Sequence, residues 1–165
     1  DEIICSTNGI PIGNYLSQFF ANIFLSDLDH KLKEQLHIKY YYRYADDMVI
    51  ICESKEQLHE YLIFIMKELK AKKLVIKKNY QIFPIAKGKN DAHGRGLDFV
   101  GYVIFMNKIY IRKNMKLNFI RSSKKLKYKH ASPDEIKIHS SAWFGWCKHA
   151  DAKELYNKLI HLNYE

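Results

Sequence analysis

The segment that most constrains the fold is residues 40–52, which read Tyr-Tyr-Tyr-Arg-Tyr-Ala-Asp-Asp-Met-Val-Ile-Ile-Cys. Aromatic and β-branched residues fill both arms of this segment. Between the arms lie Asp46 and Asp47, and aspartate is a residue type that turns tolerate. The pattern predicts a β-hairpin with two carboxylates at its tip. Arg43 is the only cation within the segment. Because two adjacent carboxylates between apolar strands are costly without a cation or hydrogen bonds, the pair is either a divalent-metal site or a solvated turn.

The charge of the chain favours nucleic acid as its partner. Its 165 residues carry 27 Lys and Arg against 18 Asp and Glu, a formal net charge of +9. Such an excess attracts phosphate backbones, although an ordinary lysine-covered surface is the alternative. A hydrophobic content of 47% is enough for a globular core. No apolar run has the length of a membrane span, so we expect no membrane partner, and three cysteines without metal-type spacing favour a reduced, cytoplasmic setting.

Helical periodicity flanks the hairpin on both sides. A loop rich in glycine and proline at residues 9–14 leads into apolar positions that recur every three or four residues over 15–35. After the hairpin, Ser54 and Gln57 have the spacing of a capping box, and the apolar positions of a second helix continue to Leu69. We expect this second helix to cover the sheet that the hairpin forms.

Strand patterns follow the second helix, and the chain then becomes basic and helical. The strand patterns lie at residues 74–76, 81–85, 98–105 and 109–112. The last two are predicted to pair as a second hairpin. Beyond it, the pattern predicts three helices, the first with a basic face. The predicted fold class is therefore α+β, with antiparallel hairpins packed on two helices over residues 1–112 and a small helical unit over 113–165.

Three motifs stand in order over roughly the first two thirds of the chain. They are Gly9-Ile10-Pro11-Ile12-Gly13-Asn14 continuing through Ser17-Gln18 to Ala21-Asn22-Ile23-Phe24-Leu25, then Tyr44-Ala45-Asp46-Asp47, and then Asp98-Phe99-Val100-Gly101-Tyr102. This order resembles the palm of reverse transcriptases. A lone Tyr-x-Asp-Asp motif is weak evidence, but joined to the upstream loop and helix it is specific. The basic helical unit looks like the start of a thumb.

The resemblance implies a role for each matching residue. It implies that Asp46 and Asp47 hold catalytic Mg²⁺ or Mn²⁺, two ions in the complete enzyme, and that Tyr44 packs under the primer end. The positions that match the segment meeting the incoming nucleotide and the template are Gly9, Pro11, Ile12, Gly13, Asn14 and Gln18. The positions that match the primer grip are Phe99, Val100, Gly101 and Tyr102. The cations that would follow phosphates without reading sequence are Lys113, Lys116, Arg121, Lys124 and Lys125.

The implied activity is RNA-directed DNA synthesis, with an RNA template, a DNA or RNA primer and dNTPs as partners. In this family another Asp comes from a strand upstream of the Gly-Pro loop. We expect that Asp, the fingers and the first palm strands to lie before Asp1 in a longer parent protein, so the 165-residue chain alone should bind Mg²⁺ weakly and not polymerise. The sheet edge exposed without those strands would favour self-association.

The resemblance also has finer features and departures. The residues after Pro11, the Ser17-Gln18 pair and the Phe-Val-Gly-Tyr and Trp-Phe-Gly-Trp stretches look most like bacterial enzymes of the diversity-generating retroelement type. Group II intron, retron and phage-defence reverse transcriptases are the alternatives. Many relatives carry Gln where Ile12 stands, so the nucleotide contact there is in doubt. The family often keeps a lysine near the pyrophosphate, and both Lys77 and Lys78 match it.

Two functions from other classes stay open. One is a noncatalytic nucleic-acid-binding module that kept the fold, and the other is a scaffold whose basic face binds an acidic accessory protein. Basic charge is common to all these hypotheses and does not separate them. The presence of both carboxylates, Asp46 and Asp47, favours the polymerase.

Overall fold

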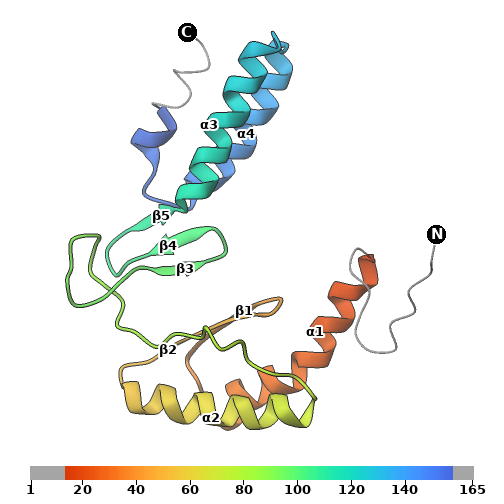
Figure 1. Ribbon diagram of the computed structural model, residues 1–165, viewed down its shortest axis with the longest axis vertical. Helices are drawn as coiled ribbons and strands as arrows, with labels where there is room; N and C mark the ends of the chain where they lie inside the picture. Colours follow the sequence, from red (N-terminus) through yellow and green to blue (C-terminus); the bar gives the residue numbers. More distant parts are fainter. Residues whose placement is uncertain (1–13, 158–165) are drawn as a thin grey trace. The chain divides into compact units, whose positions relative to one another are not determined.

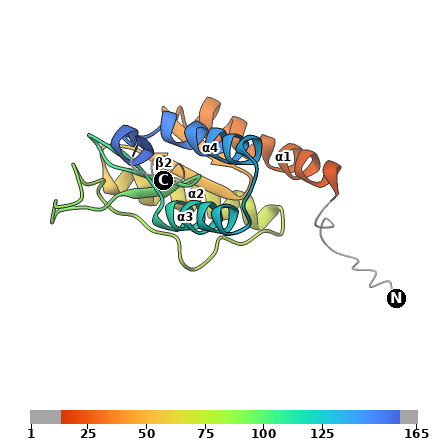
Figure 2. The same ribbon diagram turned by 90° about the horizontal axis from the view of Figure 1, so that it is seen from above.

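The computed structural model describes residues 14–157, and the chain divides into two compact units at residues 82 and 83. Figures 1 and 2 draw both units from two directions. Each unit has its own hydrophobic cluster, one built around Leu28 and Leu32 and the other around Phe119 and Trp143.

The first unit contains two helices and a hairpin. Its elements in chain order are α1 Tyr15–His30, a π-helical turn Lys31–Gln35, β1 Tyr40–Tyr44, β2 Asp47–Ile51 and α2 Lys55–Ala71. Asn14 caps α1 by accepting a hydrogen bond from the backbone N–H of Leu16 (3.0 Å), and Ser54 caps α2 by accepting one from Gln57 (3.3 Å). Both predicted helices are confirmed, and the first runs on through the π-helical turn to Gln35 as its periodicity predicts.

The hairpin packs one face on the two helices (Figure 1). The core beneath it consists of Leu25, Leu28, Leu32, Ile38, Ile65 and Leu69. Tyr41, Met48 and Ile50 project from the hairpin onto this core. Because side chains alternate along a strand, the other face carries Tyr40, Tyr42 and Tyr44, which are all exposed. The predicted antiparallel hairpin on two helices is thus confirmed.

The strands predicted at residues 74–76 and 81–85 are wrong. The chain is irregular there, apart from an isolated bridge between Ile85 and Arg95. Each apolar run is too short to gain much from pairing. Val75 is 91% exposed, while Ile76 packs against the core of the first unit. Within residues 74–76, Ile76 therefore packs on the core as a single residue rather than as part of a strand.

The second unit begins with a three-stranded antiparallel sheet. Its strands are β3 Leu97–Phe99, β4 Tyr102–Ile104 and β5 Ile109–Ile111, in that spatial order. The predicted pairing across residues 106–108 is confirmed, with Ile104 opposite Ile109. The prediction of one strand over 98–105 is wrong, because the chain reverses at Val100 and Gly101. Both have positive φ, 45° and 83°, as the two central residues of a type I′ hairpin turn require.

Two helices, α3 Lys113–Tyr128 and α4 Pro133–Lys148, complete this unit. They run alongside each other in Figures 1 and 2. The predicted start of α4 is confirmed, since Ser132 and Glu135 form a reciprocal capping box behind Pro133. A further helical segment begins at residue 153, and the residues after 157 lie outside the described part of the chain. The sheet belongs to the same compact unit as these helices. The predicted boundary at residues 112 and 113, between a palm-like part and a helical part, rests on motif content and stays a prediction.

His139 couples α3 and α4 and sets an expected pH dependence for this unit. Its Nε2 lies 2.6 Å from Ser122 Oγ, and its ring stacks on Phe119 with centroids 4.6 Å apart. Burial lowers the pKa of His139 from its ordinary value of 6.5. The unfolded chain therefore binds this proton more readily than the folded chain, and the free energy of unfolding should fall as the pH drops below 6.5.

A His139→Gln variant should lose this part of the pH dependence. Both tryptophans of the chain, Trp143 and Trp146, lie in α4, so denaturation followed by tryptophan fluorescence reports on this unit alone. His149→Gln, which changes an exposed histidine, is the matched control. An unchanged pH dependence in His139→Gln would assign the effect to another group.

Candidate active site

The carboxylate pair lies at the tip of the β1–β2 hairpin, but the two residues occupy different positions. Tyr44 pairs with Asp47, so the turn consists of Ala45 and Asp46 alone. Ala45 has a left-handed φ of 53°, as the first residue of a two-residue hairpin turn often does. The expectation that both carboxylates lie in the turn is therefore wrong for Asp47, which is the first residue of β2. Both side chains are exposed.

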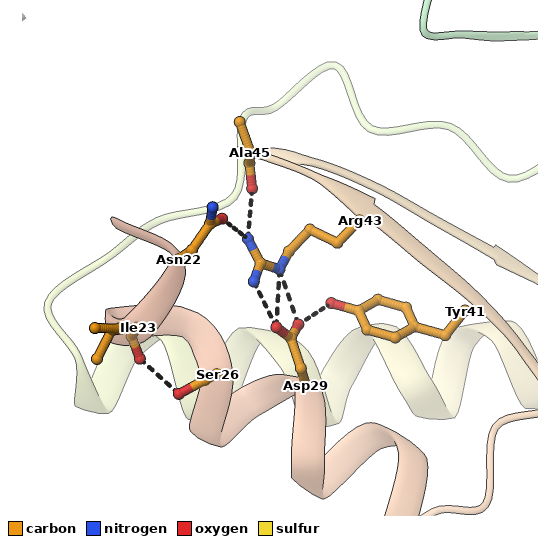
Figure 3. A network of polar contacts seen from close by, with 7 residues as sticks. All are labelled: Asn22, Ile23, Ser26, Asp29, Tyr41, Arg43 and Ala45. Carbon is orange, nitrogen blue, oxygen red and sulfur yellow. Dashed lines mark hydrogen bonds and ion pairs between the residues drawn. The ribbon is translucent and has the colours of Figure 1, made fainter. Parts of the chain in front are cut away.

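Arg43, the only cation within residues 40–52, pairs with Asp29 rather than with these two carboxylates (Figure 3). Directly opposed residues of a hairpin share a face, so Asp47 lies on the outer face with Tyr44. Arg43 is one residue earlier in β1 and therefore points to the inner face. There it forms an ion pair with Asp29 of α1, and its side chain is only 10% exposed.

The guanidinium of Arg43 makes hydrogen bonds in three directions (Figure 3). Its Nε and Nη2 donate to the Asp29 carboxylate, with Nε 2.8 Å from Oδ1. Its Nη1 donates to Asn22 Oδ1 (3.0 Å) and to the carbonyl oxygen of Ala45 (2.9 Å). Tyr41 donates its hydroxyl to the same Asp29 carboxylate at 2.6 Å. The network thus links α1, β1 and the turn before Asp46.

This network keeps Asp29 ionised. Burial by itself raises the pKa of the Asp29 carboxyl, but the hydrogen bonds from Arg43 and Tyr41 and the charge of Arg43 outweigh it and hold the pKa below its ordinary value of 3.8. Burial, together with the hydrogen bond to Asp29, raises the pKa of Tyr41. At neutral pH the pair is therefore an anion and a cation, with a neutral phenol beside them.

Lys77 is the cation that approaches the pair. Its Nζ lies 3.3 Å from Asp46 Oδ2, and both side chains are 77% exposed. Exposed ion pairs are weak and easily displaced, so this contact leaves Asp46 available to a stronger ligand. The sequence could not choose between Lys77 and Lys78, and the structure brings Lys77 to the carboxylate.

The other residues predicted to meet the nucleotide and template are only partly described. Gly9, Pro11, Ile12 and Gly13 lie outside the described residues. Asn14 caps α1, and Gln18 is exposed in the first turns of that helix. Tyr44 is 64% exposed on the face that also carries Asp47.

The predicted primer-grip residues form one turn in the second unit. Phe99 and Tyr102 pair across Val100 and Gly101, and the Tyr102 hydroxyl donates to the backbone carbonyl of Trp146 at 3.2 Å. The predicted phosphate-contacting cations Lys113, Lys116, Arg121, Lys124 and Lys125 all lie on α3. Four of these cations are exposed and Lys116 is half-buried. The structure thus gathers each of these two groups, the primer-grip residues and the phosphate-contacting cations, on one local element.

Sequence reasoning missed Asp29 and Asn22 as partners of Arg43. A signal was present, because Asn22 and Asp29 are seven residues apart and so lie on one face of α1. Tyr41 and Arg43 are two apart and so share one face of β1. These periods place two side chains on one face of α1 and two on one face of β1, but they do not say that the two faces meet.

Asp46 and Asp47 are ligands of the type that Mg²⁺ or Mn²⁺ prefers, but two carboxylates are too few to complete a metal site. Carboxylate oxygens are the ligands that hard divalent cations prefer. Within residues 14–157, however, no three His, Cys, Asp or Glu side chains gather in a way that could hold a metal ion. Asp29 is committed to Arg43. Asp46 and Asp47 therefore need further ligands to complete such a site.

The described part of the chain contains no helix that is long and apolar enough to cross a membrane.

The family model for reverse transcriptase (RNA-dependent DNA polymerase) matches residues 2–104, more than half of the chain. The matched region spans α1, α2, the Asp46–Asp47 hairpin and the turn at Val100 and Gly101. No curated protein matches the chain.

Proposed function

Because the chain belongs to the reverse transcriptase family, we propose that the tip of the β1–β2 hairpin is the metal-binding centre of an RNA-directed DNA polymerase. One observation carries this proposal. The hairpin exposes Asp46 and Asp47 together, while the nearest cation along the strand, Arg43, is engaged by Asp29. The two carboxylates thus keep their oxygens available for divalent ions.

The residues around the tip have complementary roles in this proposal. When bound to Asp46 and Asp47, two Mg²⁺ or Mn²⁺ ions supply Lewis acidity to the primer 3′-hydroxyl and to the leaving pyrophosphate. Tyr44 lies on the same face as Asp47 and offers an exposed ring on which the primer end can rest. Lys77, beside Asp46, supplies a positive charge for the pyrophosphate.

The remaining predicted residues extend this proposal along the nucleic acid. The loop of residues 9–14 and Gln18 contact the incoming nucleotide and the template, and the turn from Phe99 to Tyr102 holds the primer. The cations of α3 follow the phosphates of an RNA template and its DNA or RNA primer. In this scheme, residues 1–112 belong to the palm and residues 113–165 to the thumb.

The missing metal ligands come, in this proposal, from a segment that precedes the palm residues in the complete enzyme. The 165-residue chain alone should therefore bind Mg²⁺ weakly and extend no primer. Among reverse transcriptases, we place the chain with the bacterial diversity-generating retroelement type, on the motifs around Pro11, Gly101 and Trp143. An enzyme of this kind would work with an accessory protein that binds its basic surface.

Primer extension on an RNA template tests the function. In the complete enzyme that carries this sequence, Asp46→Asn and Asp47→Asn should each lower DNA synthesis by about a hundredfold or more, because each removes a charge that stabilises the bound metal ions. Template binding should persist in both variants. Asp27→Asn, which removes an exposed carboxylate on α1, is the control for loss of one negative charge.

Two results would count against the proposal. Full synthesis by both hairpin variants would place the active centre elsewhere. Template binding without synthesis in the wild type, with the accessory protein and a range of primers supplied, would favour a noncatalytic nucleic-acid-binding module.

A further inference from the structure

An arginine close to a metal site can compete with the metal ion for the carboxylates that bind it. Arg43 precedes Asp46 by three residues and Asp47 by four. A guanidinium binds carboxylates strongly and often through two parallel hydrogen bonds. An unengaged Arg43 would therefore compete with a divalent cation for the same oxygens.

The Asp29 carboxylate holds Arg43 on the inner face of the hairpin (Figure 3). It engages two of the three guanidinium nitrogens, Nε and Nη2. The third, Nη1, is shared between two neutral acceptors, Asn22 Oδ1 and the Ala45 carbonyl. The guanidinium therefore comes within 2.9 Å of the residue before Asp46, yet it contacts the backbone there.

Asp29 is the only charged acceptor in this set. Its side chain is 27% exposed, against 10% for Arg43, so the pair is screened less than a surface ion pair. The Tyr41 hydroxyl donates a further hydrogen bond to the Asp29 carboxylate, which binds Arg43 at the same time. Together, Arg43 and Asp29 contribute no net charge beneath the tip.

We propose that Asp29 is a positioning residue for the metal centre: by engaging Arg43 through its carboxylate, it withholds a guanidinium from Asp46 and Asp47. This inference rests on the proposed function, since it concerns the affinity of these two carboxylates for divalent ions. Asp29 itself does not touch the ions or the substrate. It acts through Arg43, whose charge would otherwise occupy the site.

The proposal makes a specific prediction for a double variant. In Asp29→Asn, Arg43 loses the one charged acceptor that it has among residues 14–157 and turns to the carboxylates of the tip, so the affinity for Mg²⁺ should fall about tenfold. In Asp29→Asn combined with Arg43→Gln, no freed cation exists, and the affinity should return to within about twofold of the wild type. A network that merely stabilises the fold would make the double variant at least as weak as Asp29→Asn.

The measurement is a titration of the 165-residue chain with MgCl₂, in which the amide NMR signals of Asp46 and Asp47 report binding. Fast exchange makes this readout suitable for weak binding, and it needs no polymerase activity. Asp27→Asn is the matched control, because it also removes one negative charge from α1. The Asp27 side chain pairs with Lys31 and Lys72 rather than with Arg43. The affinity of this variant for Mg²⁺ should equal that of the wild type. Far-UV circular dichroism checks that each variant is folded.

The outcomes separate this inference from the function on which it rests. Weakened binding in Asp29→Asn with recovery in the double variant supports the inference. Binding that Asp29→Asn leaves unchanged, or a double variant that does not recover, overturns the inference alone. Wild-type signals that do not respond to Mg²⁺ at the hairpin overturn the proposed metal centre and the inference with it.

Discussion

Replacing Gly101 with alanine is expected to lower the free energy of unfolding of the second unit by about 2–4 kcal/mol. Gly101 has a φ of 83°, a conformation that side chains disfavour. A Cβ at this position would also lie 2.6 Å from Met115 Sδ and 2.8 Å from Trp146 Cζ3. Met115 is flexible and can move, but the Trp146 ring packs against Tyr102 and has little room. The turn and the helices it contacts should therefore loosen together.

Urea denaturation followed by tryptophan fluorescence measures this effect. Gly88→Ala is the matched control, because a Cβ there meets nothing within 4 Å and the residue has no positive φ. Its stability should stay within about 0.5 kcal/mol of the wild type. Equal stabilities of the two variants would mean that the turn at Gly101 is not built as described. In the complete enzyme, Gly101→Ala should also weaken primer extension if this turn is the primer grip.

A second large effect is expected in the first unit, where Leu28→Ala should cost about 3–5 kcal/mol. Leu28 is 0% exposed and lies at the centre of the cluster that joins α1, α2 and the inner face of the hairpin. Truncating it removes buried apolar contacts and leaves a cavity beneath the sheet. Because Asp29 is the next residue, the same change should loosen the contact that holds Arg43.

Hydrogen exchange of the α1 and α2 amides measures this loss, since the first unit contains no tryptophan. Leu16→Ala makes the same truncation in the same helix, at a side chain that is 51% exposed, and should have a much smaller effect. Similar exchange rates in the two variants would show that the core is not centred on Leu28.

The parts of the fold that could be predicted from the sequence are those with a strong local period. Aromatic and β-branched residues on both arms of residues 40–52 predicted the β1–β2 hairpin, and capping signals at Ser54 and Ser132 predicted where α2 and α4 begin. The turn at Val100 was missed because a β-branched residue rarely adopts a positive φ. The apolar residues near Val75 looked like a strand, but a run of three residues does not determine whether it pairs or packs singly.

For the candidate site, exposure of Asp46 and Asp47 followed from the sequence, but the surroundings did not. The placement of Asp47 in β2 depends on the exact length of the turn, which a pair of acidic residues does not reveal. The partner of Arg43 depends on how α1 crosses beneath β1, a tertiary feature. Proximity along the chain therefore does not reveal that Arg43 pairs with Asp29.

In the proposed enzyme, the metal ions and the primer end meet at Asp46 and Asp47. Iron-mediated cleavage tests it most directly: Fe²⁺ replaces Mg²⁺ in the complete enzyme bound to a primer–template, and hydroxyl radicals then cut whatever lies beside the bound metal. We expect cuts in the polypeptide next to Asp46 and in the nucleic acid at the primer 3′ end, and the loss of both in Asp46→Asn. Cuts that persist in Asp46→Asn, or that lie away from the hairpin, would contradict it.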